Sequence, residues 1–233
     1  MLSVKTHKQE PELISYMTLR KAVGWLGVSL PAAMILGNLL FARCAYLQDS
    51  VSHYYFTITG SLFVGIVCSV GLFLITYKGY PRSIDNIVTS CGGIMAFLIA
   101  LLPTNNDSAE PCVFIHWPDS SLRWWIHYIS AAAFFIILAG TSLFLFTRSE
   151  GIKTPEKIIR NKIYRTCGVV MLLAIALVPL LKVLERWQIP LPSKPVFWLE
   201  WVALLAFGLS WLVKGELILK DRTADGPRIG RIR

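Results

Sequence analysis

The side chains best suited to chemistry in this sequence are those of Ser52, His53, His127 and Glu200. Two histidines and a carboxylate can bind Zn²⁺ and leave a fourth position for a water molecule that the metal makes nucleophilic. Ser52 is a further candidate catalytic residue. The sequence contains no His-x-x-x-His or His-Glu-x-x-His pattern, so this zinc site depends on the fold bringing distant residues together. Alternatively, both histidines lie at a membrane interface and form hydrogen bonds with their neighbours. Apart from zinc, no cofactor is predicted.

Two carboxylates have positions that need an explanation. Glu200 lies within the aromatic segment 197–201, where a lipid-facing carboxylate would be costly. We therefore expect it to turn inward to Arg123, Arg186 or His127. Asp85 begins an apolar segment, where a carboxylate caps backbone N–H groups and suits the helix dipole, so a capping role is favoured over catalysis.

Cys44 and Cys112 both fall in segments predicted to lie outside the membrane on the same side. An oxidising compartment would permit a disulfide between them, and we take this pair as a disulfide candidate.

The elements that must position these residues are membrane-spanning helices. Of the 233 residues, 55% are apolar and only 16% are charged, which disfavours a soluble enzyme, a secreted disulfide scaffold and a disordered chain. A spanning helix needs about 20 apolar residues, and six segments satisfy this requirement. They run from Ala22 to Ala42, Phe56 to Tyr77, Ile84 to Leu102, Trp124 to Thr147, Cys167 to Leu184 and Val196 to Leu219. The predicted fold is all-α: a polytopic membrane protein with a six-helix bundle.

The basic residues predict the orientation of these spans. With both termini in the cytoplasm, 18 of the 23 Lys and Arg residues lie on the inner side. We therefore predict a multi-pass protein of the plasma (inner) membrane. It would have a cytoplasmic segment at 1–21, a transmembrane domain at 22–219 and a basic cytoplasmic tail at 220–233. The same distribution explains the net charge of +9, because basic residues on the inner side contact anionic lipid head groups. No nucleic-acid partner is predicted.

An internal repeat is the most distinctive pattern. The segment from Ser90 to Pro103 aligns without gaps to that from Thr166 to Pro179, with seven of fourteen residues identical. This predicts a parallel repeat in which spans two and three correspond to spans four and five. Pro103 and Pro179 would then be equivalent positions that end or kink a helix. Two stripes of small residues predict close helix packing: Ser61, Gly65 and Ser69, and Gly92, Ala96 and Ala100.

Several short motifs carry a family resemblance. They are the segment 49–57, Leu62-Phe63-Val64-Gly65, Tyr77-Lys78-Gly79-Tyr80 and the segment 100–104, where the third predicted span ends. With these motifs, residues 19 to 147 resemble uncharacterised bacterial six-span membrane proteins of a domain of unknown function, and more distantly the DRAM-type family. The resemblance implies a six-helix bundle and no established reaction.

A weaker likeness, through Ser52, His53 and Asp85, is to the alkaline ceramidase and progestin-receptor superfamily of membrane hydrolases. That likeness implies a zinc site completed by a late His-x-x-x-His pair. This sequence has no histidine after His127. The predicted orientation also places Asp85 on the opposite side from His53.

Three functional hypotheses follow. The first is a non-enzymatic membrane protein that binds or organises lipid, or a membrane partner, through its outer face; the partner could be another membrane protein or a second copy of the chain. The second is a membrane-embedded lipid hydrolase or transferase, with or without a metal. The third is a small-solute transporter, which the repeat favours but the absence of ionisable residues in mid-span disfavours.

Overall fold

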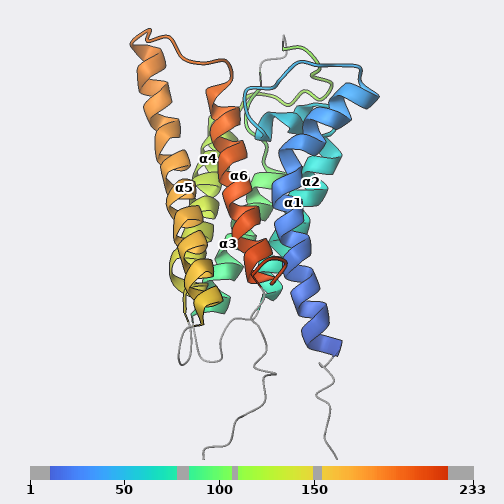
Figure 1. Ribbon diagram of the computed structural model, residues 1–233. Coiled ribbons are helices and arrows are strands. Elements are labelled where there is room, and N and C mark those ends of the chain that lie inside the picture. Colours follow the sequence, from blue (N-terminus) through green and yellow to red (C-terminus); the bar gives the residue numbers. More distant parts are fainter. Residues whose placement is uncertain (1–10, 78–83, 107–109, 149–153, 220–233) are drawn as a thin grey trace, which may run out of the picture.

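The protein is an all-α bundle (Figure 1). A computed structural model describes residues 11–77, 84–106, 110–148 and 154–219. Residues 1–10 of the predicted N-terminal segment and the predicted tail at 220–233 lie outside the described residues. The elements, in chain order, are α1 (Pro11–Phe41), η1 (Ser52–Phe56), α2 (Gly60–Thr76), α3 (Asp85–Leu101), α4 (Ser121–Gly140), η2 (Thr141–Leu145), α5 (Pro155–Arg186) and α6 (Pro195–Lys214).

The lengths and compositions of the helices are those of a membrane protein. α1, α4 continued by η2, α5 and α6 are long and apolar enough to cross a membrane, while α2 and α3 are shorter apolar helices of 17 residues each. Large apolar side chains point outward from several helices, among them Leu72, Ile129 and Leu173. In water such a surface would be unfavourable, whereas lipid tails solvate it.

The helices form a closed ring in which the last helix packs against the first. Each helix contacts its neighbour in the sequence, α6 contacts α1, and α6 also touches α4. We call the end of the bundle that holds η1 the upper end, and the end where α1 begins and α6 finishes the lower end, as they appear in Figure 1. Short connections between antiparallel neighbours produce this arrangement.

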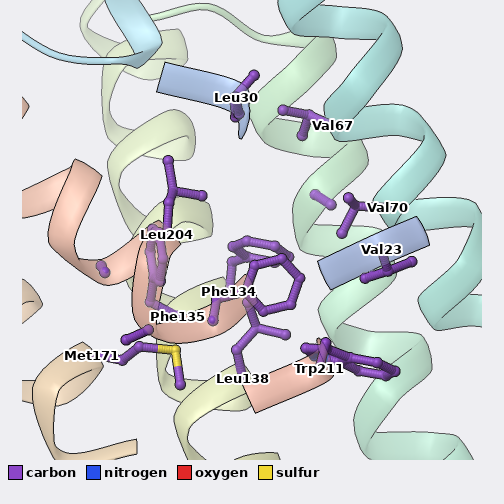
Figure 2. Close-up of a cluster of buried hydrophobic side chains, with 14 of the residues drawn as sticks. Val23, Leu30, Val67, Val70, Phe134, Phe135, Leu138, Met171, Leu204 and Trp211 are labelled. Carbon is purple, nitrogen blue, oxygen red and sulfur yellow. The ribbon is translucent and has the colours of Figure 1, made fainter. Parts of the chain in front are cut away.

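The core lies along the middle of the bundle and is rich in aromatic residues. Figure 2 shows Val23 of α1, Val67 of α2, Phe134 of α4 and Trp211 of α6 directed into one cluster. Trp211 is completely buried and packs edge-on against Phe73, Tyr77 and Phe146. Without a hydrophobic drive between helices in lipid, such close packing is the main source of cohesion.

Several helices extend beyond the predicted spans. α1 begins at Pro11 rather than near Ala22, and α5 begins at Pro155 rather than near Cys167. Thr154 caps α5 by accepting a hydrogen bond from the Lys157 N–H, so its helix begins before the apolar segment. Pro103 lies beyond the end of α3, whereas Pro179 lies inside α5, so these two prolines do not end their helices in the same way.

Glycines mark two close helix crossings. The crossing of α1 with α6 was not among the predicted stripes. A methyl group on Gly93 of α3 would lie 2.5 Å from the carbonyl oxygen of Gly71 of α2, and one on Gly208 of α6 would lie 2.5 Å from that of Gly24 of α1. The stripe of Gly92, Ala96 and Ala100 is buried, as expected. The stripe of Ser61, Gly65 and Ser69 was assigned to packing wrongly, because these residues are exposed and, in the part of the chain that the structure describes, nothing lies within 4 Å of a methyl group built on Gly65.

Candidate functional site

A cavity of about 600 Å³ lies at the upper end, between η1, α4, α5 and α6. Three of the four candidate residues, Ser52, His127 and Glu200, line it. The remaining lining residues are Ser50, Thr104, Trp124, Trp125, Tyr128, Ile129, Ala131, Ala132, Phe135, Ile175, Val178, Pro179 and Lys182. A ring of helices thus brings together side chains that are up to 150 positions apart in the sequence.

Glu200 is held in place by the backbone of the first loop. One of its carboxylate oxygens accepts hydrogen bonds from the Val51 N–H at 2.7 Å and the Ser52 N–H at 3.4 Å. Two of the three expected partners are engaged elsewhere or turned outward: Arg123 donates to the Pro103 carbonyl and to Asn105, and Arg186 is exposed. The third, His127, lines the same cavity as Glu200. Sequence patterns cannot show this arrangement, because a backbone N–H is present at every non-proline residue.

His127 and Thr104 form a second polar part of the cavity wall. The His127 Nδ1 atom lies 2.9 Å from the Leu102 carbonyl oxygen, and it must donate because a carbonyl can only accept. The Thr104 side chain is buried, and among the described residues its hydroxyl has no hydrogen-bond partner within normal distance, although the Tyr128 phenol is nearby. Both residues place polar groups beside the upper part of the cavity.

His53 does not line the cavity. Its Nδ1 atom lies 2.6 Å from the Ser50 hydroxyl, in the turn that leads into η1. Burial lowers the pKa of His53 to about 4, although the nearby Asp49 carboxylate acts in the opposite direction. The imidazole is therefore neutral at physiological pH and holds the turn that presents Ser52 to the cavity.

The cavity is polar at its upper end and apolar lower down. Along α5, Lys182 is followed toward the lower end by Pro179, Val178 and Ile175, which lies about 10 Å deeper at 1.5 Å per residue. On α4 the lining changes from His127 and Tyr128 to Ala131, Ala132 and Phe135 in the same direction. A molecule that fills this space must itself be polar at one end and apolar at the other.

The cavity opens on the apolar outside of the bundle. Trp125 and Ile129 of α4, which line it, are 57% and 62% exposed. α5, which forms the opposite wall, buries a much smaller share of its apolar residues than α6 does. In a membrane this opening would face lipid tails.

The loops above the cavity are tied together. A disulfide joins Cys44 to Cys112, with the two Cα atoms 6.3 Å apart. The Gln48 amide donates to the Pro111 carbonyl at 3.0 Å, and Lys194, at the start of α6, forms an ion pair with Asp49. Partial burial opposes it, but the Lys194 ammonium holds the pKa of Asp49 below its usual value. These contacts fix the first loop, which in turn positions Val51 and Ser52 against Glu200.

The residues expected to bind zinc do not form a metal cluster. Within residues 11–77, 84–106, 110–148 and 154–219, no three His, Cys, Asp or Glu residues are grouped so that they could hold a metal ion. Asp85, the other carboxylate considered, lies at the lower end. Its carboxylate lies 2.9 Å from the Arg148 guanidinium and forms an ion pair with it, an interaction that the expected capping role did not include.

Sequence reasoning missed the apolar half of the site. Ala131, Ala132, Ile175 and Val178 are ordinary residues of apolar helices, and nothing in their pattern separates a cavity wall from a core or a lipid-facing surface. Lys182 was not among the candidate site residues. The run of three alanines at 131–133 was the one available signal, because small side chains leave space beside a helix.

No protein-family model matches the chain, and neither does any curated protein or solved structure.

Proposed function

We propose that this chain is a multi-pass membrane protein that binds a lipid-like amphiphile in the upper cavity. The observation that carries the proposal is the lining itself: Glu200, His127 and Thr104 at one end, and Phe135, Ile175 and Val178 at the other. Such a cavity matches a polar head group followed by a hydrocarbon chain. Its exposed rim at Trp125 and Ile129 gives a route from the bilayer.

The proposal includes six spans with both termini in the cytoplasm. α2 and α3 have 17 residues each, which is at the lower end of the length that crosses a hydrocarbon core. The excess of Lys and Arg at the lower end supports a cytoplasmic location for that end. The cavity and the disulfide then lie toward the opposite side of the plasma membrane.

The head group should carry hydrogen-bond donors. Glu200 offers carboxylate oxygens, and the cavity wall also contains the hydroxyls of Ser50, Ser52 and Thr104. A group such as an alcohol or an amine can donate to these acceptors without leaving an unpaired negative charge in the cavity. We therefore propose lipids with hydroxyl or amine head groups as the ligands.

The test is to purify the protein in a mild detergent, extract bound molecules and identify them by mass spectrometry. Ala132→Phe fills the cavity, and Ile136→Phe, at a 53% exposed position of the same helix, is the matched control. We expect wild type and the control to retain a stoichiometric amphiphile and Ala132→Phe to lose it. Equal lipid content in Ala132→Phe and wild type, with both folded, contradicts the proposal.

A further inference from the structure

The carboxylate of Glu200 is not balanced by a positive charge from the described part of the protein. Among the described residues, it accepts hydrogen bonds from the Val51 and Ser52 N–H groups and forms no ion pair. Both bonds are made by the Oε2 atom, which leaves Oε1 without a bond to any described residue. A carboxylate at this depth in an apolar helix bundle usually pairs with a partner, because its charge is costly away from water.

The two basic residues that line the cavity do not supply this charge. The Lys182 ammonium pairs with Glu185 at 3.3 Å, and both side chains are largely exposed, so this ion pair lies on the outside of the bundle. His127 donates its Nδ1 proton to the Leu102 carbonyl oxygen and forms no ion pair with Glu200 in the described part of the chain. A molecule bound in the cavity can therefore supply the positive charge that Glu200 lacks.

Aromatic side chains line the cavity at the same end as Glu200. Trp124, Trp125 and Tyr128 lie near the start of α4, at the upper end of the bundle. The Trp124 ring centre is 4.8 Å from that of Trp125 and 4.5 Å from that of Tyr128, so the three rings form one group. Aromatic rings attract cations, and the attraction is larger where water is excluded. With a carboxylate at the same end, they favour an organic cation as the bound group.

Three kinds of head group differ in how they would interact with Glu200. An alcohol donates one hydrogen bond to Oε1 but leaves the negative charge unbalanced. A carboxylate or a phosphate brings a second negative charge to the same place, which is unfavourable. A protonated amine donates hydrogen bonds and balances the charge at the same time, and a bond between an ammonium and a carboxylate is about twice as strong as one between neutral groups.

We propose that the amphiphile in the upper cavity carries a protonated amine at its polar end, held by the Glu200 carboxylate and by the aromatic rings at the start of α4. We rest here on the proposed function and narrow it, because the charge of Glu200 selects amines over the alcohols that the cavity also admits. The hydrocarbon part of the ligand then extends toward Phe135 and Ile175, in the apolar half of the cavity.

The test compares three ligands that share one alkyl chain and differ in the head group: dodecylamine, dodecanol and dodecanoic acid. Each is titrated into the purified full-length protein in the same non-ionic detergent near neutral pH, where an alkyl amine is protonated as a lysine side chain is. Tryptophan fluorescence reports binding, because Trp124 and Trp125 line the cavity. We expect dodecylamine to bind at least about tenfold more tightly than dodecanol, and dodecanoic acid to bind most weakly.

Variants assign the preference for the amine to Glu200. Glu200→Gln keeps an acceptor oxygen for the Val51 and Ser52 N–H groups but removes the charge. We expect this variant to bind dodecylamine and dodecanol equally and to keep the dodecanol affinity of wild type. Glu185→Gln removes an exposed carboxylate outside the cavity and should bind all three ligands as wild type does. Ala132→Phe, which fills the cavity, should bind none of them.

The outcomes distinguish a failure of this inference from a failure of the proposed function. The inference is overturned, and an amphiphile site remains, if wild type binds dodecanol as tightly as dodecylamine or if folded Glu200→Gln keeps the preference for the amine. If Glu200→Gln does not fold, the comparison of the three ligands in wild type gives the answer. A retained amphiphile without an amine also overturns the inference. If no dodecyl ligand binds and no amphiphile is retained on purification, both the proposed function and the inference fail.

Discussion

Glu200 connects the cavity to the loop above it, since one carboxylate oxygen accepts two backbone N–H groups from the segment that carries Ser52. The residue therefore has a structural role whatever it binds. The geometry also explains how α6 can carry a carboxylate near its N-terminal end without exposing it to lipid.

Replacing Glu200 tests this role. Glu200→Ala leaves the Val51 N–H without an acceptor, and we expect a loss of about 1–3 kcal/mol in the free energy of unfolding. Glu200→Gln retains an acceptor oxygen and should lose less. Thermal unfolding of the purified protein measures both. Glu185→Ala is the control, because Glu185 is exposed and its ion pair with Lys182 lies on the surface. Equal Tm values for Glu200→Ala and Glu185→Ala would show that these hydrogen bonds add no stability.

His53 makes stability depend on pH. Its pKa is about 4 in the folded protein, against 6.5 in an unfolded chain. Between these values the unfolded state binds the proton and the folded state does not, so stability is complete above pH 6.5 and declines as the pH falls toward 4. We expect a loss of about 2 kcal/mol between pH 7.5 and pH 5. His53→Gln should remove this part of the pH dependence of Tm, whereas His116→Gln, at an exposed position, should leave it. A His53→Gln profile parallel to that of wild type contradicts this assignment.

At the residue scale, the sequence could identify Ser52, His127 and Glu200 as unusual, because polar groups at the ends of apolar segments need a reason. It could not show that Glu200 binds backbone N–H groups, or that His53 is directed to Ser50. Such contacts depend on the path of the first loop, which no local pattern encodes.

At the scale of the elements, helix packing depends on a few glycines. α1 and α6 approach closely at Gly24 and Gly208, where any side chain would meet the backbone of the other helix. The backbone of an ideal helix tolerates a larger residue at either position, so the restriction comes only from the partner helix.

Substitution of these glycines should separate packing from helix propensity. We expect Gly208→Val to lower the free energy of unfolding by about 1–3 kcal/mol through overpacking. Gly65→Val in α2 is the matched control, because none of the described residues lies within 4 Å of a Cβ atom placed there. Thermal unfolding compares the two, and similar Tm values would mean that α1 and α6 adjust to the larger residue without cost.

The positions of the apolar helices could be predicted well, because about twenty apolar residues in succession leave few alternatives. Their ends could not. α5 continues from Pro155 through Pro179 to Arg186, since polar and charged residues continue a capped helix as readily as apolar ones. The α1–α6 crossing was also missed, because Gly24 and Gly27 of α1 and Gly208 of α6 form no stripe at four-residue spacing.

At the scale of the whole molecule, the disulfide between Cys44 and Cys112 closes a chain segment of 68 residues that contains α2 and α3. A cross-link of this kind restricts the conformations of the unfolded chain. It usually raises the free energy of unfolding by about 2–4 kcal/mol.

Removing the disulfide should therefore loosen the upper end. We expect Cys44→Ser, or reduction, to lower Tm, while Cys91→Ser, at an exposed free cysteine, leaves it unchanged. Thermal unfolding with and without reductant measures the difference. A wild-type Tm that is insensitive to reductant under conditions that reduce the bond would show that the loops are held by their other contacts.

The proposed orientation can be tested by labelling in intact cells. Asp119→Cys at the upper end and Lys162→Cys at the lower end both occupy exposed positions. A membrane-impermeant maleimide should label the first in intact cells and the second only after the cells are permeabilised. The reverse pattern would place the cavity on the cytoplasmic side.

The ring of helices closes only when α6 packs against α1, so the first helix gains a partner on that face only after α6 has been synthesised and inserted. Until then the face of α1 around Gly24 is uncovered and accessible to insertion machinery or to a protease. Nascent chains that end before residue 195 should therefore be short-lived in the cell, however well their first five helices are inserted.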